Sequence, residues 1–160
     1  MGQVLINDTL TVSYPDDFQV LSDAEKAGVL VSDNYRTICL KTTERHMIVS
    51  IAWKDVDGMK GFFSKLLTGN DLVKNMDTCY KKRLKPNGYK NEGRLSTQVG
   101  GMNADGLRYS YTAQGIDMIG ESFVLKKDKS IYYFHCCYRR EFAGESSVTW
   151  NALLGDAQWK

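Results

Sequence analysis

The sequence predicts a single α+β domain built around a mostly antiparallel sheet. Its length of 160 residues suits one domain, and no linker or internal repeat divides residues 1–160. The spacing of apolar residues changes from the two-residue period of strands to the period of a helix and back again. Strands, a long helix, hairpin-connected strands and a closing helix, in that order, are typical of an α+β fold.

Short strands are predicted before the long helix. Residues 10–14 (Leu-Thr-Val-Ser-Tyr) alternate apolar and polar side chains, and the following Pro-Asp-Asp ends the run. Residues 18–21, 28–32 and 37–42 have the same β-rich character. Residues 47–53 are apolar on both faces, which predicts a central strand of the sheet.

The long helix is predicted over residues 59–84. Residues 68–71 (Thr-Gly-Asn-Asp) interrupt it, so we expect a kink or two helices in series. Asp57 suits the N-cap, and Pro86-Asn87-Gly88 ends the helix. The apolar residues at helical spacing are Met59, Phe62, Phe63, Leu66, Leu67, Val73, Met76, Tyr80 and Leu84.

A β meander and a short helix complete the prediction. The strands span residues 93–99, 104–113, 119–126 and 131–139, with short turns between them. Residues 146–157 form a short amphipathic helix. Its apolar residues are Val148, Trp150, Leu153 and Leu154. The last strand is apolar on both faces, with Tyr132, Phe134, Cys136 and Tyr138 on one and Ile131, Tyr133, His135 and Cys137 on the other.

No catalytic constellation emerges from the motifs. The sequence has no Gly-x-Ser-x-Gly nucleophile elbow and no phosphate-binding glycine loop. A calcium loop counted from Asp55 lacks the required glycine and glutamate. His135 and Cys137, which share a strand face, are the one pair to consider for catalysis or metal binding. We predict no catalytic residue, no metal site and no cofactor.

The four cysteines are expected to be buried and unpaired. They are Cys39, Cys79, Cys136 and Cys137. This usage suits a reducing compartment, so we expect a cytoplasmic protein unless a secretory or lipoprotein leader has been trimmed from it. No stretch approaches the ~20 apolar residues of a membrane helix.

Charge is balanced overall but concentrated on the predicted helix. The chain has 21 basic and 19 acidic residues, which is too even a balance to predict nucleic-acid binding. A cationic cluster of Lys81, Lys82, Arg83 and Lys85 lies near the C-terminus of the helix. Cations are favoured there by the helix dipole, and they could also bind an acidic partner surface.

Aromatic side chains are concentrated in the meander, where Tyr109 and Tyr111 share one strand face. Packing in the core or on the sheet surface is their ordinary role, and a concave apolar groove for a peptide or small ligand is the alternative. Together with the cationic cluster, Tyr109 and Tyr111 are the candidate partner-binding residues.

Three segments carry a resemblance to a known family. They are residues 10–15 followed by Phe18, the pattern Gly101-x-x-Ala104-x-x-Leu107-x-Tyr109, and Trp150-x-x-Leu153 in the closing helix. With this layout the chain resembles the Mog/PsbP-like fold family, which includes PsbP, Ran-binding Mog proteins, bacterial lipoproteins and EagR-type chaperones of type VI secretion effectors. The resemblance implies an α/β/α sandwich around an antiparallel sheet, and a protein that binds other proteins rather than a catalyst.

Three functions remain open from the sequence. The first is a non-catalytic module that binds a protein partner, with a chaperone-like role for apolar segments as one version. The second is a carrier of a small apolar ligand on the aromatic sheet face. The third is an enzyme that uses His135 and Cys137. An exposed sheet edge or apolar sheet face could also support a homodimer.

Overall fold

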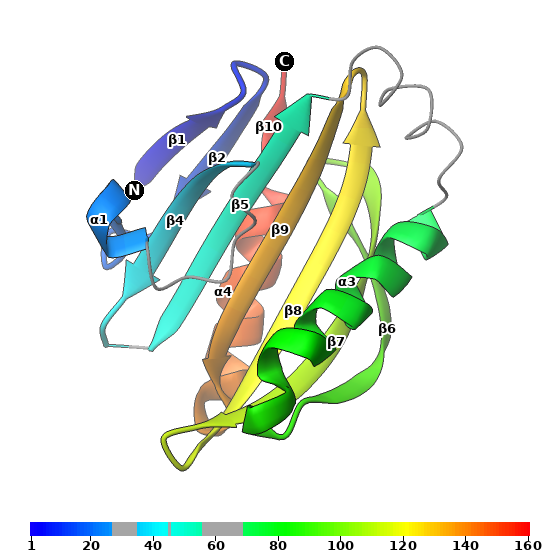
Figure 1. The fold of residues 1–160 in the computed structure, drawn as a ribbon. Helices are drawn as coiled ribbons and strands as arrows, with labels where there is room; N and C mark the ends of the chain where they lie inside the picture. Colours follow the sequence, from blue (N-terminus) through cyan, green and yellow to red (C-terminus); the bar gives the residue numbers. More distant parts are fainter. Residues whose placement is uncertain (27–34, 45, 56–68) are drawn as a thin grey trace.

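A computed structural model describes residues 1–26, 35–44, 46–55 and 69–160 (Figure 1). The helices are α1 (Asp23–Lys26), α3 (Gly69–Leu84) and α4 (Ala143–Gly155), with 3-10 turns η1 (Lys85–Asn87) and η2 (Arg140–Phe142). The strands are β1 (Gly2–Ile6), β2 (Leu10–Tyr14), β3 (Gln19–Val20), β4 (Arg36–Thr42), β5 (Met47–Asp55), β6 (Lys90–Val99), β7 (Met102–Ala113), β8 (Ile116–Lys127), β9 (Ser130–Arg139) and β10 (Gln158–Trp159).

A seven-stranded sheet forms the centre of the molecule, in the order β3-β4-β5-β9-β8-β7-β6. Every strand pairing is antiparallel. Strand β5 lies inside the sheet between β4 and β9, so the prediction of a central strand over residues 47–53 is confirmed. The pairing of β5 with β9 joins segments about 85 residues apart and forms the middle of the sheet.

Two layers cover the sheet, one on each face (Figure 1). Helix α3 packs on one face, against β7 and β8. Helix α4 packs on the other face, together with a small antiparallel sheet in the order β1-β2-β10. The predicted α+β sandwich is therefore confirmed. The small sheet is an addition that the strand pattern did not predict, because β10 has only two residues.

Strand β9 contributes to both hydrophobic cores, as its alternation predicted. Phe134 and Tyr138 lie in the core against α4, whose Trp150 is fully buried. Ile131 and Tyr133 belong to the core beneath α3. Adjacent residues of one strand point to opposite faces, which is why a strand covered on both sides must be apolar at nearly every position.

The small sheet is held to the large one by hydrogen bonds from its turn and its last strand. Asn7 Nδ2 donates to the Tyr132 hydroxyl of β9 at 3.0 Å. Trp159 Nε1 of β10 donates to the backbone oxygen of Val99 at 2.8 Å. These bonds lie on the α4 side and leave the α3 side of the sheet to the pocket described below.

The C-terminal part of the predicted long helix is confirmed as α3. It buries Leu72, Val73, Met76 and Leu84 against the sheet. It ends as predicted at residues 86–88, where Gly88 adopts a φ of +71° that favours glycine. Residues 28–32, Asp57 and the helical pattern over 59–67 lie outside the described residues. Of the predicted interruption over residues 68–71, Thr68 also lies outside them, whereas Gly69, Asn70 and Asp71 form the first residues of α3.

Two side-chain predictions were wrong. Val148 was placed on the apolar side of the closing helix, but it is 71% exposed. It lies two positions before Trp150, about 200° around the helix, so it faces solvent when Trp150 faces the core. Cys79 was expected to be buried, but it is exposed, because it borders an open pocket rather than packed side chains.

The other cysteines lie close to expectation. Cys39 and Cys136 are buried and Cys137 is half-buried, and none of the four cysteines forms a disulfide bond. Within the described ranges, no helix combines the length and the apolar character that a membrane crossing would require.

Candidate functional site

A pocket of about 280 Å³ opens on the sheet face that carries α3. Helix α3 covers β7 and β8 but not the neighbouring part of the same face on β5 and β9, and the pocket lies at this border. Its described lining residues come from α3, the sheet and the segment before β4. They are Asn75, Met76, Cys79, Tyr80 and Arg83 of α3, Ser50 and Ala52 of β5, Tyr133 and His135 of β9, and Tyr35.

The floor of the pocket contains a row of buried polar residues in an otherwise apolar face. Ser50 of β5 pairs with His135 of β9, and His135 in turn pairs with Ser122 of β8. All three are buried. The hydroxyls of Ser122 and Tyr80 of α3 share a hydrogen bond of 2.8 Å. The Cys39 thiol donates to the Ser50 hydroxyl at 3.6 Å. A largely apolar pocket with a few placed polar groups is the usual form of a ligand site.

Aromatic rings form the wall between the pocket and the core beneath α3. The ring centre of Tyr80 lies 5.1 Å from that of Tyr109 and 5.6 Å from that of His135. Across the pocket, Tyr35 contacts Tyr133 edge-on with ring centres 5.4 Å apart. Such aromatic contacts add about 0.5–1.5 kcal/mol to the energy of burial, so these rings give the pocket fixed walls.

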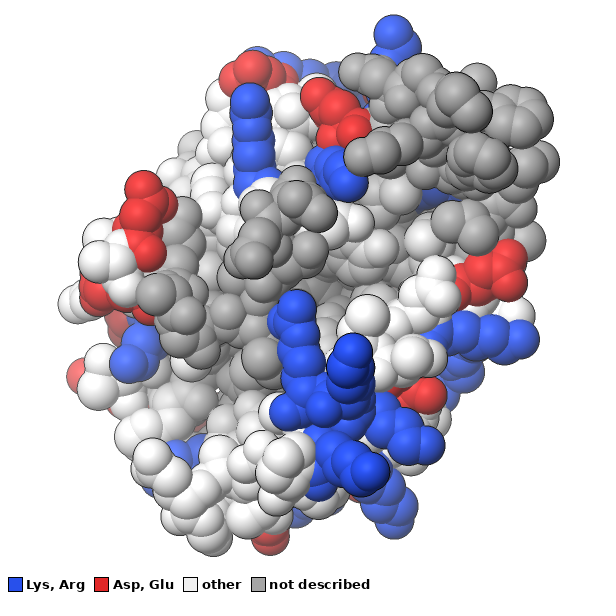
Figure 2. All heavy atoms as spheres, in the orientation of Figure 1, with Lys and Arg blue, Asp and Glu red and all other residues white. Residues whose placement is uncertain are grey.

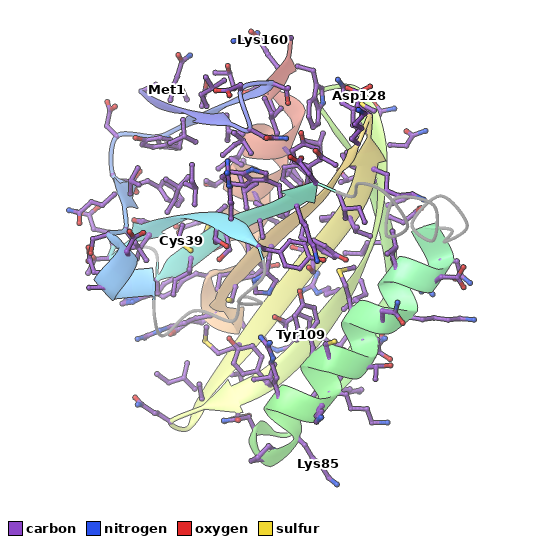
Figure 3. The ribbon with its side chains drawn as sticks, turned by 45° about the horizontal axis from the view of Figure 1, so that its top comes forward. Met1, Cys39, Lys85, Tyr109, Asp128 and Lys160 are labelled. Atoms are coloured by element: carbon purple, nitrogen blue, oxygen red, sulfur yellow. The ribbon has the colours of Figure 1, made fainter. Side chains whose placement is uncertain are left out.

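Tyr109 reaches His135 by crossing the intervening strand at a glycine. Tyr109 of β7 pairs with Gly120 of β8, and Gly120 pairs with Cys137 of β9. A Cβ atom at position 120 would overlap the Tyr109 ring. Without it, the ring lies across β8 and its hydroxyl makes a short hydrogen bond with His135 Nε2. Figure 3 labels Tyr109 between the sheet and α3.

Burial keeps His135, Tyr80 and Cys137 neutral near pH 7. Removal from water lowers the pKa of His135 to about 4. The same cause raises the pKa of Tyr80 to about 12 and that of Cys137 to about 11. A thiol with this pKa is not a thiolate nucleophile at neutral pH.

The structure brings His135 and Cys137 to one strand face, as predicted, but gives each its own tyrosine. His135 bonds to Tyr109, whereas the side chain beside the Cys137 thiol is that of Tyr111, whose hydroxyl acts to lower the thiol pKa against the larger effect of burial. The two side chains therefore do not form a nucleophile–base pair with each other. In residues 1–26, 35–44, 46–55 and 69–160, no group of three His, Cys, Asp or Glu side chains is placed to hold a metal ion.

The cationic cluster of Lys81, Lys82, Arg83 and Lys85 lies at the C-terminal end of α3, the helix that borders the pocket. All four side chains are exposed, and Figure 2 shows Lys and Arg side chains gathered over α3. Arg83 is the member that lines the pocket itself. No ion pair of these four is found within the described part of the chain.

The two candidate tyrosines do not lie at the surface of the pocket. Tyr109 is fully buried and supports His135 from behind. Tyr111 is half-buried, and its ring stacks on Tyr109 with centres 5.8 Å apart. Both belong to the support of the site rather than to its described lining.

The sequence did not single out Tyr35, Ser50, Ala52, Tyr80 or Tyr133 as site residues. The alternation of β5 and β9 placed Ser50 and Tyr133 on definite faces, and helical spacing placed Tyr80 on the buried side of α3. The pairing of β5 with β9 and the position at which α3 crosses the sheet cannot be predicted from a local pattern.

Comparison with known proteins rests on structure alone. No family model matches the chain, and no curated protein matches its sequence. The solution structure of cyanobacterial PsbP (CyanoP) from Synechocystis sp. PCC 6803 matches over 99% of this chain and 92% of that one, with a TM-score of 0.70 and 9% identity. The chain has a Mog/PsbP-like fold.

Further solved structures share this Mog/PsbP-like fold. PA94 from Pseudomonas aeruginosa, a protein of unknown function, matches with a TM-score of 0.56 and 13% identity, over 97% of this chain and 94% of that one. A protein from Bacteroides thetaiotaomicron matches with a TM-score of 0.58 and 9% identity, over 94% of this chain and 45% of that one. At these identities the similarity shows the fold, and function must be argued from the site.

Proposed function

We propose that the chain is a non-catalytic protein-interaction module that holds an apolar segment of a partner protein in the pocket beside α3. The observation that carries the proposal is a partly open aromatic pocket bordered by exposed cations. The pocket has an apolar wall of tyrosines and Met76, a polar floor at His135, and Arg83 at its side. A chaperone-like role, in which the module covers an apolar segment of its client, is one form of this function.

The size of the pocket favours a side-chain anchor over a free small molecule. Its volume of about 280 Å³ lies just below the range of about 300–1,000 Å³ that is usual for small-molecule sites. One large apolar side chain, with part of the backbone that bears it, fills such a space. Interfaces of this kind draw most of their affinity from a few apolar anchors seated in pockets.

The cationic cluster defines the surroundings of that anchor. Lys81, Lys82 and Lys85 are exposed at the same end of α3 as the pocket-lining Arg83, so acidic residues flanking the anchor would be attracted to this end of the helix. Attraction between exposed charges is weakened by salt, because the screening length falls from about 10 Å at 0.1 M to about 3 Å at 1 M. The apolar contact is not weakened in this way, so salt separates the two contributions.

A non-catalytic role is supported by the state of the candidate nucleophile and base. The thiol of Cys137 is protonated at neutral pH because burial raises its pKa to about 11. His135 is bonded to Tyr109 instead of Cys137. An enzyme that used this pair would need both side chains to converge on one substrate.

A capture experiment with matched variants tests the proposal. The tagged protein is incubated with an extract of the cells that encode it and washed at low and at high salt. We expect Ala52→Trp, which fills the pocket, to reduce capture of the partner at least tenfold at both salts. The pair Lys81→Glu and Lys82→Glu should reduce capture mainly at low salt. Val148→Ser on the opposite layer is the control and should capture like the wild type.

Two outcomes would contradict the proposal. Undiminished capture by Ala52→Trp, shown to be folded by circular dichroism, would mean that the pocket does not hold the partner. Absence of any partner, together with a small molecule found by native mass spectrometry, would favour the second function, a carrier of a small apolar ligand in the same pocket. A homodimer remains a prediction, which light scattering of the purified protein tests.

A further inference from the structure

The row of polar residues on the pocket floor includes His135, whose ring has two nitrogens that can form hydrogen bonds. Ser122 is bonded to Tyr80, and Ser50 contacts the thiol of Cys39. His135 bonds through Nε2 to Tyr109. For its other ring nitrogen, Nδ1, no hydrogen-bond partner is found in the part of the chain that the structure describes. Nδ1 is not among the buried unsatisfied side-chain atoms of that part, which agrees with the place of His135 in the lining of the pocket.

The partner of His135 decides where the proton of the ring lies. The Tyr109 side chain is fully buried, and among the described residues its hydroxyl has His135 Nε2 as its one hydrogen-bond partner. If Nε2 donated to this hydroxyl, the hydroxyl proton of Tyr109 would be buried without an acceptor. Such a group costs about 1–3 kcal/mol. The opposite arrangement leaves the unpaired proton on Nδ1 of a ring that lines the pocket, where water or a ligand can accept it. The hydroxyl therefore donates to Nε2, which carries no proton.

A neutral imidazole carries a proton on one of its two nitrogens. His135 is neutral because burial lowers its pKa to about 4. With Nε2 occupied as an acceptor, the proton lies on Nδ1. The bond that one ring nitrogen makes thereby determines the state of the other. Nδ1–H is then a hydrogen-bond donor at the floor of an apolar pocket.

We propose that Tyr109 holds His135 in its Nδ1–H tautomer and that this N–H recognises an acceptor oxygen, a carbonyl or carboxylate, on the apolar segment bound in the pocket. The recognition half rests on the proposed function, because it uses the same pocket. Arg83, the cation that lines this pocket, is also a donor without acceptor capacity. His135 and Arg83 therefore both favour an acceptor oxygen over an amine.

The tautomer can be measured in the free protein, independently of any partner. Long-range ¹H–¹⁵N correlation of uniformly labelled protein at pH 7 distinguishes the protonated from the unprotonated ring nitrogen. We expect Nδ1 of His135 to be protonated in the wild type and in Tyr111→Phe, the matched control, whose ring stacks on Tyr109 and whose hydroxyl lies near Cys137 rather than His135. In Tyr109→Phe we expect at least part of the population to become protonated at Nε2 instead. Protonation at Nε2 in the wild type would overturn the proposal.

The recognition half is tested with two probes that share an apolar body. We expect 3-phenylpropanoate to shift the His135 resonances and 3-phenylpropylamine to leave them unchanged. His135→Gln should weaken binding of 3-phenylpropanoate about five- to tenfold, which corresponds to one ordinary hydrogen bond.

Equal binding of both probes, or binding of neither, would overturn the recognition half. If His135 carried its proton on Nδ1 but neither probe bound, the recognition of an acceptor oxygen would be contradicted. Partner capture would still be judged separately by the Ala52→Trp variant. Conversely, if Ala52→Trp lost the partner but the wild type carried the His135 proton on Nε2, the proposed function would stand and the tautomer proposal would fail. The two proposals therefore fail separately.

Discussion

Replacing Gly120 with alanine is expected to lower the free energy of unfolding by about 1–3 kcal/mol, the usual cost of forcing an extra carbon into a packed core. The new Cβ would overlap the ring of Tyr109, which crosses β8 at this glycine. The ring cannot move aside freely, because it stacks with Tyr80, Tyr89 and Tyr111. Urea denaturation of the wild type and Gly120→Ala measures the difference.

A double-mutant cycle shows whether the cost comes from Tyr109. In a Tyr109→Leu background the alanine meets a smaller side chain, so we expect the second substitution to cost little. Contacting residues typically show coupling energies of about 0.5–3 kcal/mol. Strictly additive effects would mean that Gly120 does not act through Tyr109. Tyr109 would then reach His135 without needing the space that this glycine leaves.

The stability of the protein should fall between pH 6.5 and pH 4 because of His135. In the unfolded chain this side chain has its ordinary pKa of 6.5, whereas in the folded protein burial lowers the pKa to about 4. Between these values the unfolded state binds a proton that the folded state does not, so the free energy of unfolding decreases as the pH falls. At about 1.36 kcal/mol per pKa unit, the contribution is about 3 kcal/mol, and below pH 4 no more is lost.

His135→Gln isolates this contribution, since carboxylates also titrate in acid. We expect the wild type to lose about 3 kcal/mol more than His135→Gln between pH 6.5 and pH 4. The groups around His135 do not mask the effect. Tyr80, Tyr109 and Cys137 remain neutral there because burial raises each pKa. Parallel stability curves for the two proteins would show that His135 is not buried as a neutral ring.

The sequence predicted the features of the fold that depend on neighbouring residues in the chain, such as the two faces of β9 and the end of α3. The alternation in β9 placed Phe134 and Tyr133 on opposite faces, because side chains of a strand alternate whatever the strand pairs with. The end of α3 at Gly88 followed from proline and glycine chemistry. By contrast, β10 has two residues, too few for any periodic signal, and Val148 was misplaced because an apolar residue is not always a buried one.

The candidate site was only partly predictable, because its geometry depends on non-local pairing. The sequence placed the cationic cluster at the end of the helix, but the approach of Arg83 to the pocket depends on where α3 crosses the sheet. His135 and Cys137 were recognised as sharing a face. Their separate tyrosine partners come from β7, which reaches them across β8. The role of Gly120 follows from that register and from no local feature.

Site-specific photo-crosslinking tests the central claim, that the pocket beside α3 holds a protein partner. A benzoylphenylalanine residue is placed at Asn75, which lines the pocket, or at the exposed Val148 of α4, in cells that encode the protein. We expect a discrete protein adduct from position 75, none from position 148, and loss of the adduct when Ala52→Trp fills the pocket. An adduct that forms equally from both positions, or that survives Ala52→Trp, would contradict the claim.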